Sequence, residues 1–321
     1  MDQTLNSSQT PASTPNPPGA DALGRAHLAL GALILVVCAC GIVGNSMVVW
    51  LLSFCVQRAP FCVYVLHLAV ADLLFLLCAT FTVSLEVASL AARWWKAYEV
   101  MQRVEYFAYT CSLSLLTAIS TQRCLSVLFP IWYRCHRPRH LSTTVCTLLW
   151  GLSLLMNTVS SFFCIKSGHP DEKQCLMVDS TSRCLILGIF IPMMTLSSVT
   201  LFVRVQRSPP QRRRRPRRLY VVILVSVLVF LLCAVPFAFN PILLSWGHLK
   251  GQVVLLYRHV SLLSTSVSSS ANPIIYFVVG RRRSRRGLRE PLGAVLRTAL
   301  QEEPELEERE TPSTGTNELG V

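Results

Sequence analysis

The sequence predicts an all-α membrane protein, a bundle of seven transmembrane helices followed by a short amphipathic eighth helix. The chain is 52% hydrophobic and only 15% charged, which is too apolar for an ordinary soluble protein of 321 residues. Seven apolar runs are each long enough to cross a bilayer. The last run contains Asn272 and Pro273, a pair that interrupts helical hydrogen bonding and needs polar partners inside a membrane.

The apolar runs and the segments around them divide the chain into four parts. Residues 1–26 are polar and rich in Ser, Thr and Pro, without a signal-peptide pattern, and are expected to form a disordered extracellular tail. Residues 27–280 contain the bundle. Residues 281–300 have the pattern of an amphipathic helix on the inner membrane surface, and residues 301–321 form an acidic cytoplasmic tail. The spanning helices are expected near residues 28–54, 61–87, 99–129, 141–164, 176–203, 219–244 and 252–279.

The net charge of +13 is distributed unevenly along the chain. Arginines gather after the third, fifth and seventh runs, within 134–139, 204–218 and 281–289, whereas the opposite loops carry few cations. Because positive residues stay on the cytoplasmic side, we expect the N-terminus outside the cell and the C-terminus inside. Basic segments beside helices contact lipid headgroups, so the charge does not indicate nucleic-acid binding. The sequon at Asn6 then lies outside, where it can carry a glycan.

Two of the 13 cysteines differ from the others, most of which lie inside apolar runs as small hydrophobic residues. Cys164 and Cys175 flank a short polar loop at the outer ends of the fourth and fifth helices. An oxidising exterior favours a disulfide between them. Closing so short a loop would stabilise the fold by roughly 2–3 kcal/mol. The alternative is a pair of free thiols.

Several polar residues lie inside the predicted membrane helices, where an unpartnered charge is costly. Asp72 lies in the second helix, Asn45 in the first, Ser112 in the third, and Ser268 and Asn272 in the seventh. We expect these side chains to converge into one hydrated pocket that holds a sodium ion. The alternative is a hydrogen-bonded structural cluster without an ion.

Arg123 ends the third run at the cytoplasmic boundary, where its long side chain can reach water, lipid phosphates or a protein partner. Together with marks in the other helices, it resembles the rhodopsin-like G-protein-coupled receptors. Residues 112–140 resemble the Mas-related subfamily of these receptors. The resemblance covers all seven helices. The other marks are Gly44-Asn45, Leu68-Ala69-x-Ala71-Asp72, Trp150, Pro192, Pro236 and Asn272-Pro273-x-x-Tyr276.

The resemblance implies a multi-pass receptor of the plasma membrane that couples to heterotrimeric G proteins, Gq/11 and also Gi/o, in sensory neurons for pain and itch. It assigns Arg123 and Tyr276 to the coupling face. It also assigns Asn272, Pro273 and Pro236 to the helix movement that opens this face. Ser and Thr residues of the acidic tail are expected to be phosphorylated by receptor kinases and to recruit arrestin.

The sequence departs from the wider receptor pattern in ways that bear on activation. Gln122 stands before the helix-three arginine, where most relatives carry an acid, and the start of the sixth helix is basic. A carboxylate clamp on Arg123 therefore cannot form, and we expect measurable basal signalling. Ala234 stands where most relatives have a tryptophan. The third helix has no cysteine at its outer end, which favours the Cys164–Cys175 disulfide and an open, shallow pocket.

The ligand site is expected at the outer ends of the third and fifth helices. Arg103 lies 20 residues before Arg123 and hence about 30 Å away, and Asp179 lies at the outer end of the fifth helix. A guanidinium and a carboxylate on neighbouring helices can bind both ends of a small zwitterion, and the resemblance implies an amino acid such as β-alanine. Alternatively, each residue pairs within its own helix, Arg103 with Glu99 and Asp179 with Arg183. Further candidates for the pocket are Glu105, Tyr106, Tyr109, Trp246 and Arg258.

Other function classes fit the sequence less well. A receptor of the same subfamily for a peptide or amine is the nearest alternative, although the outer half of the fourth helix has no acid to bind a polycation. A transporter usually shows internal repeats, and the sequence has none. No metal-ligand cluster or nucleophile motif indicates an enzyme or a cofactor.

Overall fold

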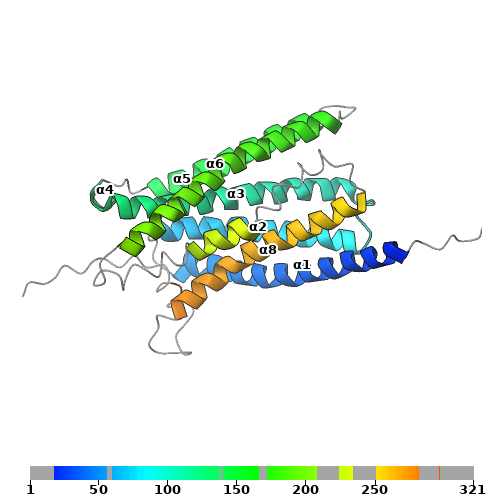
Figure 1. Cartoon of the computed structure of the whole chain (residues 1–321), viewed down its shortest axis with the longest axis horizontal. Helices are drawn as coiled ribbons and strands as arrows, with labels where there is room; N and C mark the ends of the chain where they lie inside the picture. Colours follow the sequence, from blue (N-terminus) through cyan, green and yellow to red (C-terminus); the bar gives the residue numbers. More distant parts are fainter. Residues whose placement is uncertain are drawn as a thin grey trace, which may run out of the picture.

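The computed structural model describes residues 18–55, 60–136, 138, 140–165, 172–207, 224–233, 251–281 and 296. The described residues form long helices that run along one common direction (Figure 1). A π-helix, η1, continues the first helix for one turn. The helices are α1 (Pro18–Trp50), η1 (Leu51–Cys55), α2 (Pro60–Val87), α3 (Trp95–Leu128), α4 (Pro130–Cys135), α5 (Leu141–Ile165), α6 (Glu172–Arg207), the segment Leu224–Cys233 and α8 (Gly251–Arg281).

The long helices follow the predicted spans closely. Five of them, α1, α2, α3, α5 and α6, are long and apolar enough to cross a membrane, counted within the described residues. The predicted seventh span is α8, whereas only Leu224–Cys233 of the predicted sixth span is described. One boundary differs: α1 begins at Pro18, so residues 18–26 are helical and not part of a disordered tail. Proline suits a first helical position because its fixed φ matches the helix and its missing N–H has no partner there.

The centre of the bundle is formed by α2 and α3. α3 packs against α2, α5 and α6, and α1 packs against α2 and α8. Large side chains fill these contacts, among them Tyr64 and Phe75 of α2 and Leu113 and Leu115 of α3. In contrast, α1, α5 and α6 expose many apolar side chains. This distribution is that of a membrane bundle, in which the outer helices present apolar residues to lipid.

The bundle has two distinct ends. At one end, α2 and α3 are joined by a short turn, residues 88–94, and we call this the turn end. At the other, the short helix α4 follows α3, and we call this the α4 end (Figure 1). The turn brings Glu86, near the end of α2, close to Tyr98 in the first turn of α3. Arg103 lies toward the turn end of α3, and Arg123 lies toward its α4 end.

Glycine permits close packing between α1 and α8. A Cβ atom built on Gly41 would lie 2.1 Å from Ser270 Oγ and 2.7 Å from Leu76 Cδ1. On Gly44 it would lie 3.1 Å from Pro273 Cβ. The two glycines therefore let the part of α8 that contains Pro273 approach α1.

Candidate functional site

Asp72 is at the middle of a polar group that joins three helices, which we call the polar centre. Its side chain is buried, and its two oxygens accept hydrogen bonds from Ser112 Oγ and Asn272 Nδ2, each at 2.8 Å. Ser112 belongs to α3 and Asn272 to α8. The sequence-based prediction that these three side chains converge is confirmed.

Asn45 extends the polar centre to α1. Its Nδ2 donates to the backbone oxygens of Gly41 (2.9 Å) and Ser269 (3.2 Å), so the side chain joins α1 to α8. Its Oδ1 is buried and has no hydrogen-bond partner among the described residues. Ser268 is also buried on α8. The polar centre thus offers carboxylate, hydroxyl and amide oxygens, the ligand types that hard cations prefer.

Arg123 lies near the α4 end of α3 and is buried. Its guanidinium carbon lies 3.9 Å from the centroid of the Phe61 ring, which belongs to the first turn of α2. Gln122, beside it in the chain, has a buried Oε1 without a hydrogen-bond partner among the described residues. Sequence reasoning identified Arg123 but not its aromatic neighbour, because nothing in the apolar pattern distinguishes Phe61 from other core residues.

The remaining predicted coupling residues are only partly described. Tyr276 is buried on α8, one turn after Pro273. Pro236 lies outside the described residues, as do Trp246 and Asn6. Of the predicted amphipathic helix 281–300, the structure describes only Arg281 and Leu296.

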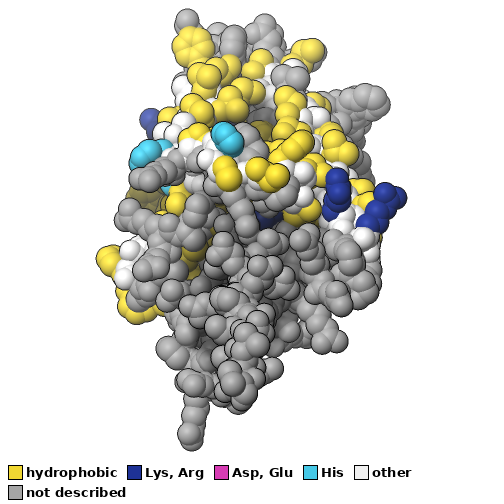
Figure 2. All heavy atoms as spheres, turned by 90° about the vertical axis from the view of Figure 1, so that its left-hand side faces the viewer, with side chains coloured by type: hydrophobic (Ala, Val, Ile, Leu, Met, Phe, Trp, Pro, Cys, Tyr) yellow, Lys and Arg dark blue, Asp and Glu magenta, His cyan; other side chains and the backbone are white. Residues whose placement is uncertain are grey.

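The α4 end presents a basic and apolar face (Figure 2). Ile131 of α4 is 75% exposed, and Arg204 and Arg207 are exposed in the last turns of α6. Phe129 and His136 are exposed nearby in the chain. Figure 2 shows no acidic side chain on this face within the described part of the chain. Such a surface is complementary to a partner that carries apolar and acidic side chains.

Arg103 is half-buried on α3, toward the turn end. Asp179 lies on α6, toward the same end, but its side chain is outside the described residues. α3 and α6 pack against each other, as the predicted ligand site requires. Cys164 lies on α5 and Cys175 on α6, but the side chains of both are also outside the described residues. The predicted disulfide between them therefore stays a prediction.

The other candidate pocket residues on α3 point in different directions. Glu105 is buried against α2, where Thr82 Oγ1 donates to its carboxylate at 3.2 Å. Tyr106 and Tyr109 stack on each other with centroids 6.4 Å apart, and Tyr109 also stacks on Phe230 at 6.2 Å. The tyrosines therefore form an aromatic contact between α3 and the segment Leu224–Cys233, whereas Glu105 belongs to the α2–α3 contact.

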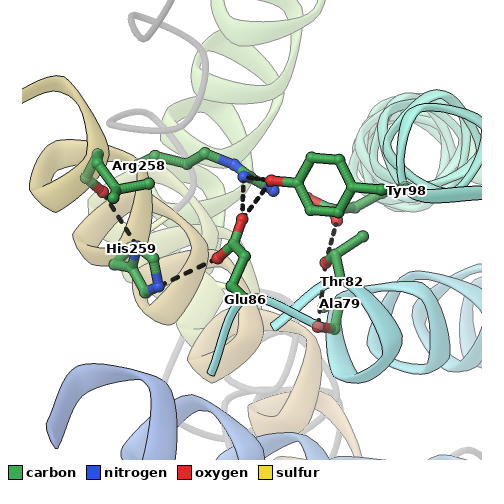
Figure 3. A network of polar contacts seen from close by, with 8 residues as sticks. Ala79, Thr82, Glu86, Tyr98, Arg258 and His259 are labelled. Atoms are coloured by element: carbon green, nitrogen blue, oxygen red, sulfur yellow. Dashed lines mark hydrogen bonds and ion pairs between the residues drawn. The ribbon is translucent and has the colours of Figure 1, made fainter. Parts of the chain in front are cut away.

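A charged group at the turn end escaped the sequence analysis, and we call it the Glu86 cluster. The carboxylate of Glu86 pairs with Arg258 and accepts a hydrogen bond from Tyr98, and Arg258 also donates to the tyrosine oxygen (Figure 3). His259 Nε2 lies 3.2 Å from the second Glu86 oxygen. The cluster thus joins α2, α3 and α8.

The Glu86 cluster also reaches α1. The ring of His27 makes an edge contact with the ring of His259, with centroids 4.9 Å apart. His259 Nδ1 lies 3.0 Å from the backbone oxygen of Leu255. Arg258, which sequence reasoning assigned to the ligand pocket, is bonded to protein groups on two other helices. No group of three or more metal-ligating side chains occurs within the described residues.

Comparison with known proteins bears on what these groups do. Residues 44–276 match the family described as 7 transmembrane receptor (rhodopsin family). The chain is 56% identical over its whole length to the Mas-related G-protein coupled receptor member D of Macaca fascicularis, and 55% identical to that of Homo sapiens, each relative also being covered completely. It is 39% identical to member X1 of Homo sapiens over 96% of this chain and 94% of the relative.

Proposed function

The chain belongs to the rhodopsin family of seven-transmembrane receptors, within it to the Mas-related G-protein coupled receptors, and we propose that it binds a small zwitterionic amino acid such as β-alanine. A protein of this family is a multi-pass receptor of the plasma membrane that couples to heterotrimeric G proteins, and it is not an enzyme. We propose further that the turn end faces the exterior, as the distribution of arginines predicts.

The ligand proposal is supported mainly by the packing of α3 on α6. This contact places two helices side by side that carry Arg103 and Asp179 toward the same end. An arginine binds a carboxylate through two parallel hydrogen bonds, and an aspartate pairs with an ammonium group. β-Alanine carries both groups on a two-carbon spacer, so it is the simplest probe of such a site. Arg258 does not compete for the ligand carboxylate while Glu86 is bonded to it.

The coupling proposal is supported by the basic and apolar face at the α4 end. Ile131 of α4 and Arg204 and Arg207 of α6 are all exposed toward this end of the bundle, which suits a partner helix with an apolar face and acidic residues. Gq/11, and also Gi/o, are the proposed G proteins. Receptor kinases and arrestin are proposed to act on the tail 301–321, and sensory neurons for pain and itch are the proposed cells.

The deciding experiment is intracellular calcium and cAMP in transfected cells exposed to β-alanine. The parent should respond, and Arg103→Ala and Asp179→Ala should each lose the response at equal surface expression. Arg93→Ala is the matched control, because Arg93 is an exposed cation of the turn end outside the helices. Glu99→Ala tests the alternative in which Arg103 only pairs within α3.

The outcomes separate the proposals. A parent that responds to peptides or amines but not to β-alanine would replace the ligand and leave the receptor assignment in place. If Arg103→Ala and Arg93→Ala lose the response to β-alanine equally, positive charge at the turn end acts nonspecifically. This result would contradict a site in which Arg103 and Asp179 bind the two ends of the ligand.

For the polar centre, a sodium ion is the proposed occupant. Asp72 supplies a buried carboxylate, and Asn45 Oδ1 is a buried acceptor without a hydrogen-bond partner among the described residues. Sodium chloride, compared with choline chloride at equal ionic strength, should then raise the melting temperature of the purified parent. It should have no such specific effect on Asp72→Asn. Equal melting temperatures of the parent in both salts would favour the purely structural cluster.

A further inference from the structure

His259 lies between two oxygen atoms that only accept hydrogen bonds. The residue is buried on α8, about two turns after the start of that helix at Gly251. Its Nδ1 lies 3.0 Å from the backbone oxygen of Leu255, one turn earlier in the same helix. Its Nε2 lies 3.2 Å from Oε2 of Glu86 on α2 (Figure 3). A carbonyl and an ionised carboxylate have no proton to donate, so both ring nitrogens face acceptors.

Glu86 is held in its charged form by the other side of the cluster. Arg258 pairs with Oε1 of the carboxylate, and a neighbouring cation favours ionisation of an acid. Oε2 is buried and accepts no hydrogen bond from the described residues. A buried carboxylate oxygen needs compensation, and the ring of His259 is the group that faces this one.

The protonation state of the ring follows from these two contacts. A neutral imidazole carries one N–H group and one lone pair. Whichever nitrogen of His259 lost its proton, the lone pair would point at an oxygen 3.0 or 3.2 Å away. The imidazolium ion has an N–H group on both nitrogens and therefore suits both contacts.

The charges around the ring also balance when His259 is protonated. The titratable and charged groups that the described helices bring to this region are His27 of α1, Glu86 of α2, Tyr98 and Glu105 of α3, and Arg258 of α8. Two cations, His259 and Arg258, then stand against two carboxylates, while Tyr98 keeps the hydroxyl hydrogen that it donates to Glu86. A further charge on His27 would repel that of His259 at a centroid distance of 4.9 Å.

We propose that His259 is a proton-sensitive link, which holds the turn end of α8 against α2 while its ring is protonated and weakens when the proton is lost. Water reaches the cluster, because the side chains of Arg258 and Glu86 are 17% and 13% exposed. The proton therefore exchanges with solvent, which is the cell exterior in the proposed orientation. The stability that the link contributes is present at low pH and is lost as the pH rises through the titration of His259.

The test is the melting temperature of the receptor purified in detergent, measured from about pH 6 to about pH 9, where ordinary carboxylates stay ionised. His259→Gln keeps an amide donor for Glu86 and removes the titratable ring. His27→Phe keeps a ring beside His259 and removes the other histidine of the pair. His136→Gln, at an exposed site of the α4 end, is the matched control for the loss of a histidine.

The parent should melt about 2–6 °C above His259→Gln at the acid end of the range, the size of a charge-assisted hydrogen bond. As the pH rises, the melting temperature of the parent should approach that of His259→Gln. His27→Phe and His136→Gln should follow the parent. His259→Lys keeps its positive charge throughout this range and should lack the parent's pH dependence. It replaces His259→Gln should that protein not survive purification.

Three results would overturn the proposal. The first is a pH dependence that is the same in the parent and in the His259 variant. The second is a constant difference between these two proteins at every pH, which would mean that the ring acts through packing alone. The third is a pH dependence that disappears in His27→Phe and persists in the His259 variant. None of these results involves the ligand or G-protein coupling, so each leaves the proposed function in place.

Discussion

The Glu86 cluster offers a direct test of whether charges at the turn end hold the bundle together. The perturbation is Glu86→Gln, which removes the charge and keeps the shape of the side chain. Arg258 then loses its ion pair, and the Tyr98 hydroxyl and His259 lose a charged acceptor. Because these partners lie on α3 and α8, the substitution weakens two helix contacts at once.

The magnitude follows from burial. Removing one partner of a fully buried ion pair costs about 3–5 kcal/mol, whereas an exposed pair contributes at most about 1 kcal/mol. The side chains of Arg258 and Glu86 are 17% and 13% exposed, so the pair is close to the buried limit and partly screened. We therefore expect Glu86→Gln to destabilise the receptor by about 2–4 kcal/mol.

The assay is a double-mutant cycle on receptor purified in detergent, read by thermal and denaturant unfolding. Arg258→Met removes the other charge and keeps the length of the side chain. The double variant should lose less stability than the sum of the single variants, because the second substitution removes a charge already deprived of its partner. Arg93→Met, at an exposed site of the same end, should change stability by no more than about 0.5 kcal/mol.

Two results would refute this reasoning. The first is a Glu86→Gln protein as stable as Arg93→Met, which would mean that water or lipid headgroups screen the pair. The second is strict additivity of the two single variants, which would mean that Glu86 and Arg258 each act through other contacts.

Three further predictions concern packing, the polar centre and activation. Gly41→Ala should lower surface expression and cost about 1–3 kcal/mol, because its methyl group meets Ser270 of α8, whereas Gly151→Ala, with open space around it, should be neutral by both measures. Ser112→Ala removes one donor to Asp72 and should lower unfolding stability by about 0.6–2 kcal/mol; a variant as stable as the parent would show that the bond adds nothing. The parent should signal above empty-vector cells without ligand, and equal calcium and cAMP levels would contradict this.

The fold could be predicted from the sequence because a membrane imposes strong local rules. Each spanning helix needs about 20 apolar residues. The apolar runs predicted most ends of α1, α2, α3, α5, α6 and α8 to within a few residues. The start of α1 could not be placed, since Pro18 to Gly24 contains a proline and two glycines, which disfavour a helix, and directly follows the polar stretch of residues 1–17. It is helical because helix formation continues cooperatively beyond the apolar part of a chain.

The two polar groups differed in how far sequence could predict them. Asp72 and Asn272 lie in the middle of apolar runs, where each needs a partner, so their convergence follows from the cost of leaving either unpaired. Glu86 and Arg258 lie near helix ends, where water or headgroups can solvate a charge and no partner is required. Their contact spans 172 positions in the chain and depends on how α8 lies against α2, which local pattern does not determine.

The described polar bonds between helices differ in strength across the bundle. α8 is joined to α2 by charged hydrogen bonds at both the polar centre and the Glu86 cluster, and in the cluster Arg258 of α8 also donates to Tyr98 of α3. Two neutral hydroxyl pairs are described between α6 and its neighbours, Thr121 with Ser197 at 3.4 Å and Ser160 with Ser182 at 3.2 Å. Bonds to charged groups contribute about twice as much as neutral ones. The hydroxyl pair between Thr121 of α3 and Ser197 of α6 is therefore weaker than the charged bonds described for α8. A ligand bound between α3 and α6 would act on two helices that this weaker pair joins.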